Sequence, residues 1–149
     1  MPIDPHSRVL VTGAEGCIGA WVTKILLEAG AEVIAYDLTS ANQRLALIAP
    51  DLDLSRLRHE IGHIEDTARV KAVVRDSNVS HIVHLAAVLM PYCQANPVSG
   101  GLINVIGTLN VFEAARDARE ASGRDIRISY ASSSAVWGPE DKYEDRPLN

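Results

Sequence analysis

The sequence contains few cysteines, no excess of positive charge and no long apolar run. Cys17 and Cys93 are its two cysteines, too few for a disulfide framework or a zinc knuckle, which indicates a reducing compartment. The formal net charge of −5 argues against a protein that neutralises a nucleic-acid backbone. No segment approaches about 18 consecutive apolar residues, and the amino terminus lacks the features of a signal peptide. We therefore expect a cytoplasmic protein with no nucleic-acid or membrane partner.

The residues that are present describe one globular domain. Hydrophobic residues make up 47% of the chain and charged residues 22%, a composition typical of soluble folded proteins. A chain of 149 residues is long enough for one hydrophobic core. We find no internal repeat, low-complexity segment or linker. A single domain over residues 1–149 is predicted.

Short apolar segments alternate with stretches of helical periodicity. The strand Arg8–Thr12 is followed by a helix, because apolar residues then recur at helical spacing. These residues are Ile18, Trp21, Val22, Ile25, Leu26 and Ala29. Further strands are predicted at 32–36, Leu57–Ile61, 81–86 and 126–131. Between them lie a helix carrying Val70, Val73 and Val74 and a long helix with Leu102, Val105, Ile106, Leu109 and Phe112 on one stripe.

This alternation predicts the fold class. Strands that are apolar almost throughout are typical of a parallel sheet covered by helices on both faces. Because crossovers between parallel strands are right-handed, we expect the spatial order 3-2-1-4-5. The chain is thus predicted to be an α/β protein with a Rossmann-type, doubly wound parallel sheet.

A glycine-rich turn, TGAEGCIG, joins the first strand to its helix. Gly13 allows the tight turn, Gly16 allows a bound group to approach the backbone, and Gly19 allows close packing of the helix. The helix begins near Cys17, and its free N–H groups favour an anion. A pyrophosphate is the expected occupant.

An acidic residue at the end of the second strand indicates the cofactor. Asp37 follows Gly19 by 18 positions, where a carboxylate accepts the two hydroxyls of an adenosine ribose. It would repel a 2′-phosphate, and Leu38 offers no compensating cation. NAD is therefore preferred to NADP, although Arg44 is a cation nearby.

Four motifs resemble those of a known family. TGAEGCIG is similar to TGxxGxxG, HLAA at 84–87 to the segment that lines the cofactor after the fourth strand, and NVIGT at 104–108 to NVxGT. SSSAVWG at 132–138 is similar to S-S/T-x-x-V-Y-G. Together they resemble the extended short-chain dehydrogenase/reductases, the NAD-dependent epimerases and dehydratases that act on nucleotide sugars. The likeness covers nearly the whole chain.

The resemblance implies a role for each motif residue. Pyrophosphate would contact Gly13, Gly16, Cys17, Ile18 and Gly19, and Asp37 would bind the ribose. The adenine would lie against His63 and Ile64, where the family often has Asp-Ile. The middle of the cofactor would be lined by Leu85, Ala86, Ala87 and Asn104. Ser133 would be the catalytic hydroxyl that bonds the reacting sugar oxygen.

The proton shuttle of the family, Tyr-x-x-x-Lys, does not occur in this sequence. The residues four positions after Tyr36, Tyr92, Tyr130 and Tyr143 are Ser40, Asn96, Ser134 and Pro147. We therefore expect the amino-terminal part of a longer enzyme, without its substrate domain and inactive alone. The resemblance further implies a homodimer for the full-length protein, formed partly through the long helix.

Three alternatives stay open for the function. Ser134 and Ala135 stand where sugar dehydratases carry Asp-Glu, which favours an epimerase or a dehydrogenase acting on a nucleotide sugar or related polyol. A non-catalytic NAD-binding sensor or regulatory module would not need the shuttle.

The third alternative is a zinc peptidase, because HEIGH at 59–63 matches H-E-x-x-H. That chemistry requires a helix. In a strand the two imidazoles would lie roughly 13 Å apart, and we therefore expect no metal.

Overall fold

The chain folds around one parallel sheet. The computed structural model describes residue 4, residues 6–133 and residue 136. Its strands are β1 (Arg8–Thr12), β2 (Glu32–Asp37), β3 (Leu57–Ile61), β4 (His81–His84) and β5 (Arg127–Tyr130). They pair in the order β3-β2-β1-β4-β5, and every neighbouring pair is parallel. This confirms the predicted fold class and strand order.

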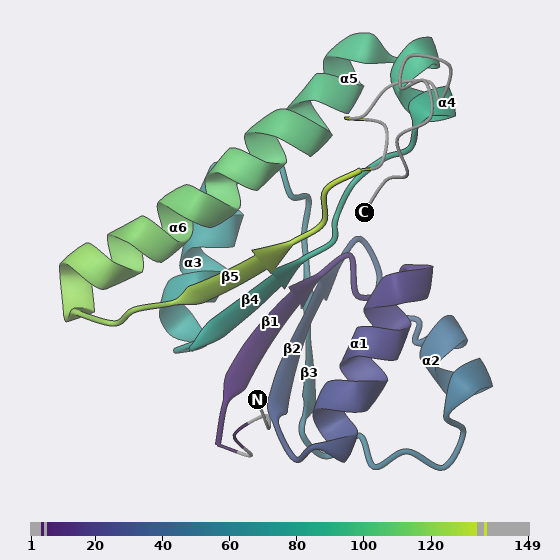
Figure 1. The fold of residues 1–149 in the computed structure, drawn as a ribbon, viewed down its shortest axis with the longest axis vertical. Coiled ribbons are helices and arrows are strands. Elements are labelled where there is room, and N and C mark those ends of the chain that lie inside the picture. The colour runs from purple at the N-terminus through teal and green to yellow at the C-terminus, as the bar shows by residue number, and fades with distance from the viewer. Residues whose placement is uncertain (1–3, 5, 134–135, 137–149) are drawn as a thin grey trace, which may run out of the picture.

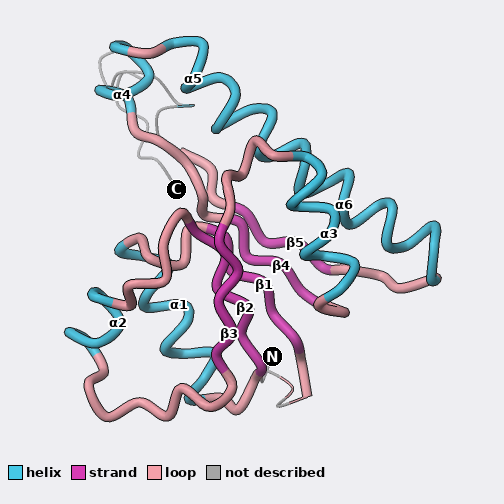
Figure 2. Tube along the Cα trace, turned by 180° about the vertical axis from the view of Figure 1, so that it is seen from behind, coloured by secondary structure: helices cyan, strands magenta, loops and turns pink. Residues whose placement is uncertain are grey.

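Helices cover the sheet from two sides, as Figure 1 shows. One layer contains α1 (Cys17–Glu28), with α2 (Gln43–Ile48) beside it. The other contains α3 (Thr67–Asp76) and α6 (Gly107–Ser122). Two short helices, α4 (Met90–Ala95) and α5 (Pro97–Gly101), lead through the π-helical turn η1 (Leu102–Ile106) into α6. Seen from behind, the loops after the strands gather at one edge of the sheet (Figure 2).

Strand alternation divides the core into two clusters. Val9 and Val11 of β1 face α1, whereas Leu10 between them faces α3 and α6. In β2, Ala35 joins the first cluster and Tyr36 the second. Because successive side chains of a strand point to opposite faces, each buried strand contributes to both layers. The pattern explains why these strands are apolar almost throughout.

The apolar residues at helical spacing in α1 coincide only in part with its buried face: Leu26 is buried and Val22 packs against the core. Ile18, Trp21 and Ile25 are exposed to 64%, 49% and 53%. The residues buried against the sheet are Gly19, Ala20, Thr23, Leu26 and Leu27. Small side chains let the first turns of the helix approach closely, and Leu26 and Leu27 fill the contact nearer its end, whereas Ile18, Trp21 and Ile25 lie outside it.

The stripe predicted for the long helix is present, but it lies on the outer face of the helix. Leu102, Val105, Ile106 and Leu109 are exposed to between 39% and 58%. The helix instead buries Gly107, Asn110, Val111, Ala114, Ala115 and Ala118. The exposed apolar residues of η1 and α6 thus form an outward surface, here called the Leu109 stripe and made of Leu102, Val105, Ile106 and Leu109.

Two strands are shorter than predicted. β4 ends at His84, so that residues 85–88 form a loop at the edge of the sheet. β5 covers Arg127–Tyr130, and Arg127, Ser129 and Tyr130 are exposed. The expectation that strands are covered on both faces therefore fails for β5 within the described residues.

The continuous helical run Pro97–Ser122 is the one helix in the described part of the chain that is long and apolar enough to cross a membrane, judged by length and composition. The core helix of a soluble protein passes the same test. In this chain Val111 and Ala114 of that run are buried in the cluster formed with α3 and the sheet. The run thus has the packing of a core helix on one face.

Candidate functional site

The glycine turn between β1 and α1 is a tightly packed backbone structure. Gly13 has φ of +70°, and a Cβ there would lie 2.8 Å from the amide nitrogen of Ala86. A Cβ on Gly19 would lie 2.0 Å from the carbonyl oxygen of Gly13. Real side chains do not tolerate such distances. Gly19 is therefore required by the approach of α1 to its own turn, a more local reason than the predicted packing on the sheet.

The first amides of α1 are available for a ligand. Gly16 precedes the helix in an extended conformation and supplies no side-chain cap. Its own N–H donates to the carbonyl of Gly13 at 3.0 Å. In residues 4, 6–133 and 136, the N–H groups of Cys17 and Ile18 have no acceptor. Unpaired N–H groups and the positive end of the helix dipole attract an anion at this position.

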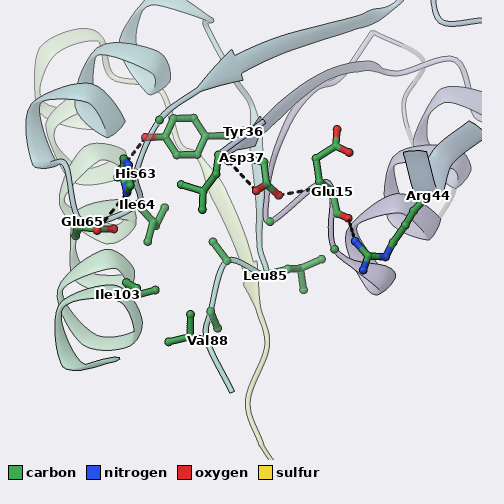
Figure 3. A pocket seen from close by; sticks show the side chains of 16 residues that line it. Glu15, Tyr36, Asp37, Arg44, His63, Ile64, Glu65, Leu85, Val88 and Ile103 are labelled. Atoms are coloured by element: carbon green, nitrogen blue, oxygen red, sulfur yellow. Dashed lines mark hydrogen bonds and ion pairs between the residues drawn. The ribbon is translucent and has the colours of Figure 1, made fainter. Parts of the chain in front are cut away.

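Two charged side chains bracket the Glu15 residue of the turn (Figure 3). The Glu15 N–H donates to Oδ2 of Asp37 at 2.9 Å, and Nη1 of Arg44 donates to the Glu15 carbonyl oxygen at 2.7 Å. The Leu38 N–H donates to Oδ1 of Asp37 at 2.7 Å. These bonds fix the orientation of the carboxylate before any ligand arrives.

The loop after β3 is held by buried groups from two other elements. The hydroxyl of Tyr36 donates to the carbonyl of His63 at 2.8 Å, and Nδ2 of Asn110 donates to the carbonyl of Ile64 at 3.0 Å. Burial raises the pKa of Tyr36 to about 12, so the phenol is protonated and remains a donor. Ile64 is buried, and His63 is exposed and pairs with Glu65 at 3.4 Å.

His84 connects the two sides of the site. The Thr108 hydroxyl donates to the Asn104 carbonyl at 2.7 Å, so its oxygen accepts the Nε2–H of His84 at 3.0 Å. The other ring nitrogen, Nδ1, then accepts the Thr12 hydroxyl at 2.7 Å. This network assigns a neutral imidazole, and burial lowers the pKa of His84 below its ordinary value.

The same Thr12 oxygen accepts the N–H groups of Leu85 and Ala86, each at 3.2 Å. One hydroxyl therefore joins the start of the glycine turn to the loop after β4.

Asn104 acts on the site through the backbone. Its Oδ1 accepts the Val88 N–H at 2.8 Å, and its Nδ2 donates to the Val88 carbonyl at 2.9 Å. The Asn104 side-chain amide therefore satisfies both backbone groups of Val88, as a neighbouring strand would. Asn104 does not line the cavity described below, whereas Val88 does.

Ser133 lies in the segment that follows β5. It is exposed, its carbonyl accepts the Val136 N–H at 3.2 Å, and it does not line the cavity. Ser134, Ala135 and the residues from Trp137 onward lie outside the described residues. The catalytic role of Ser133 stays a prediction.

The HEIGH sequence lies in β3 and the turn after it, as the strand prediction required. His59 interacts through Nε2 with Nδ2 of Asn42 at 3.0 Å, and His63 pairs with Glu65. Neither histidine has the helical setting that a zinc peptidase needs. Among the described residues no group of three or more His, Cys, Asp or Glu side chains could hold a metal ion.

A cavity of about 330 Å³ brings most of the predicted residues together. It lies at the carboxyl edge of the sheet, between the glycine turn and the loops after β3 and β4. Predicted residues that line it are Gly13, Gly16, Asp37, His63, Ile64, Leu85, Ala86 and Ala87. Five predicted residues do not line it: Cys17, Ile18, Gly19, Asn104 and Ser133. Of these, Gly19 packs against the glycine turn and Asn104 bonds Val88, so both support residues that do line it.

Sequence reasoning did not assign eight of the lining residues to the site. They are Glu15, Tyr36, Leu38, Arg44, Gly62, Glu65, Val88 and Ile103. Glu15, Glu65 and Val88 adjoin predicted residues, so a wider window around each motif would have included them. Arg44 and Ile103 come from helices, and no local pattern indicates that their side chains reach the cavity.

The fold and this cavity define a Rossmann-type domain with a binding site at the carboxyl edge of its sheet. The family model described as GDP-mannose 4,6 dehydratase matches residues 10–147. The chain therefore belongs to this family, within the extended short-chain dehydrogenase/reductases, as its motifs indicated.

Three relatives illustrate the range of the family. The chain is 30% identical over 146 residues to the UDP-glucose 4-epimerase of Lactobacillus helveticus, with 95% of this chain and 41% of the epimerase covered. It is 30% identical over 151 residues to the methionine adenosyltransferase 2 subunit beta of Xenopus tropicalis, covering 97% and 39%. The Bordetella bronchiseptica enzyme WbmH, solved in complex with NAD⁺, superposes with a TM-score of 0.70 at 28% identity, covering 89% and 41%. The chain thus spans about two fifths of each relative.

Proposed function

We propose that the cavity binds NAD and that this chain is the cofactor-binding part of an NAD-dependent epimerase or dehydrogenase acting on a nucleotide sugar or related polyol. The observation that carries the proposal is the pairing of two features in one place. Unpaired N–H groups begin α1, and the oriented carboxylate of Asp37 lies at the end of the neighbouring strand. A diphosphate and a ribose need these two groups at adjacent positions.

The residues present fit the cofactor. Cys17 and Ile18 would donate their N–H groups to the diphosphate, and Gly13 and Gly16 leave room for it. Asp37 would accept the ribose hydroxyls, since each of its oxygens has one protein donor and a further lone pair. His63 and Ile64 would flank the adenine, and residues 85–87 would line the middle of the cofactor. Asn104 would hold that loop through Val88.

Most of the proposed site residues would bind and orient the cofactor, and few would take part in the reaction. When bound, the nicotinamide supplies a hydride acceptor for a carbinol carbon of the substrate. Ser133 would bond the reacting oxygen. Without a Tyr-x-x-x-Lys pair in the 149 residues, no described side chain is assigned to take the proton, and we expect binding with little or no turnover.

The proposed domain organisation follows from the coverage of the relatives. We infer that residues 1–149 form the NAD-binding domain and that the substrate domain lies in the part of the relatives this chain does not span. In the full-length protein the Leu109 stripe would meet a second copy, giving a homodimer. Sedimentation of full-length protein with Leu109→Gln should then show a weaker dimer than wild type, and an unchanged dimer would contradict this assignment.

A non-catalytic NAD-binding regulatory module is the second candidate. It is supported by the relative that is named as a subunit of a methionine adenosyltransferase. The full-length sequence of the protein distinguishes the two candidates. A Tyr-x-x-x-Lys pair there supports the enzyme, and a full-length sequence without one supports the regulatory module.

Titration of NAD against purified protein tests the binding proposal. Asp37→Ala should weaken NAD at least about tenfold, the loss expected from removing hydrogen bonds to a charged group. Asp53→Ala is the matched control, because Asp53 also accepts a backbone N–H, from Ser55 at 2.9 Å, but lies outside the cavity. Equal NAD affinity in wild type and Asp37→Ala would contradict the proposal.

A further inference from the structure

Arg44 is a cation at the ribose end of the cavity whose charge no carboxylate neutralises in the described part of the chain. Its described interaction is the bond from Nη1 to the Glu15 carbonyl at 2.7 Å. By contrast, Arg69 beside the β3 loop contacts the carboxylate of Glu60 at 2.6 Å. Arg44 is exposed and lines the cavity together with Asp37 and Leu38. It therefore keeps both its charge and further donors for a ligand.

The positions of Arg44 and Asp37 place opposite charges around one site. Both bind Glu15, Asp37 through the N–H and Arg44 through the carbonyl, and Figure 3 shows the three residues in a row along the cavity. A ribose hydroxyl donates to a carboxylate, whereas a 2′-phosphate is repelled by it and attracted by a guanidinium. A guanidinium has five donors and binds phosphate oxygens in pairs. Only one Arg44 donor is used on Glu15.

We propose that Arg44 is a second determinant of cofactor choice, a partner for a 2′-phosphate whose effect Asp37 opposes. The inference rests on the proposed function, since it concerns the same cavity. It makes the preference for NAD a balance between two charges. Removal of the Asp37 charge should therefore turn the site toward NADP, and this change should require Arg44.

A double-mutant cycle tests the proposal. NAD and NADP are titrated against wild type, Asp37→Asn, Arg44→Gln and the double variant. Asn keeps the size of Asp and removes its charge. We expect Asp37→Asn to bind NADP at least about tenfold more tightly than wild type does, the size of one charge-assisted hydrogen bond. The double variant should lose that gain, and Arg44→Gln alone should increase the ratio of NAD to NADP affinity.

Two further variants serve as controls for the double-mutant cycle. Asp37→Asn with Arg44→Lys retains a charge without the planar fork and should keep part of the NADP gain. Arg56→Gln is the matched control, because Arg56 also donates to a carbonyl, that of Gly30 at 2.7 Å, away from this cavity. Circular dichroism and thermal unfolding confirm that each variant is folded.

The outcomes separate this inference from the proposed function. If wild type binds NAD but Asp37→Asn gains no NADP affinity, or gains it equally without Arg44, the inference is wrong and the proposed function stands. If folded wild type binds neither dinucleotide, the proposed function is wrong and the inference falls with it.

Discussion

The two halves of the carboxyl edge of the sheet differ in how completely their residues are supported. The half formed by β1, β2 and β3 carries the glycine turn, Asp37 and the β3 loop, and side-chain hydrogen bonds hold each of them. The half formed by β4 and β5 carries the 85–88 loop, which Thr12 and Asn104 hold, and Ser133, which follows a strand with three exposed residues of four. The supported half is the one proposed for adenosine and diphosphate. The half proposed to react, which carries Ser133, is the less supported one.

The largest expected effect on stability comes from adding a side chain at Gly19, where the backbone of α1 lies against the glycine turn. Gly19→Ala should lower the free energy of unfolding by about 3 kcal/mol, because its Cβ would lie 2.0 Å from the Gly13 carbonyl. Gly101→Ala is the control, since a Cβ there meets nothing within 4 Å and alanine favours a helix. Denaturant unfolding measures both. Similar stability of the two variants would show that the turn is looser than described.

His84, which joins the two halves, should give the next largest effect. His84→Gln should cost about 2 kcal/mol, because Thr12 and Thr108 lose a buried partner. The folded pKa of His84 is lowered, so its contribution to stability is present above about pH 6.5, the ordinary pKa, and is lost as the pH falls through the folded pKa.

Unfolding free energies measured between pH 5 and pH 8 would test this (roughly the range over which a histidine titrates). The acid loss of stability should be smaller in His84→Gln than in wild type. His81→Gln is the control, because His81 is only half-buried. If the plot of unfolding free energy against pH became flatter in His81→Gln and stayed unchanged in His84→Gln, the acid loss would come from His81 and the prediction would be wrong.

Two tyrosines give the finest test of the comparison, one in each half. Tyr36→Phe should lose about 1 kcal/mol and bind NAD less tightly, because the hydroxyl no longer holds the His63 carbonyl. Tyr130 is 59% exposed, and Tyr130→Phe should change neither quantity. The folded pKa of Tyr36 is raised to about 12. Its contribution is therefore full below about pH 10 and is lost as the pH rises toward 12, a loss absent from Tyr36→Phe. Equal behaviour of the two variants would remove the distinction between the halves.

Sequence reasoning predicted the strands better than the helix faces, for a physical reason. The bounds of β1 and β3 agree with the prediction; β1 is a short apolar segment closed by a turn, the kind of segment that specifies a strand directly. In α1 and α6, helical spacing identified a helix but not the face that packs. Gly19, Ala20, Ala114 and Ala118 carry little hydrophobic signal, yet they are buried because their small size allows close packing.

The site was predictable where a motif is local and unpredictable where it depends on folding. The glycine turn and Asp37 follow from spacing along the chain. The contact of Arg44 with the turn does not, because 29 positions separate it from Glu15. Tyr36 precedes Asp37 but faces the opposite side of β2, so its bond to the β3 loop appears only in the folded chain.

The most direct test of the central claim is amide NMR of the isolated chain during titration with ADP-ribose and, separately, with adenosine. The N–H groups of Cys17 and Ile18 have no protein acceptor among the described residues, and the claim is that they bind a diphosphate. We predict large shifts of the Cys17 and Ile18 signals with ADP-ribose and small ones with adenosine. Unchanged Cys17 and Ile18 signals in a chain that binds ADP-ribose would contradict the account.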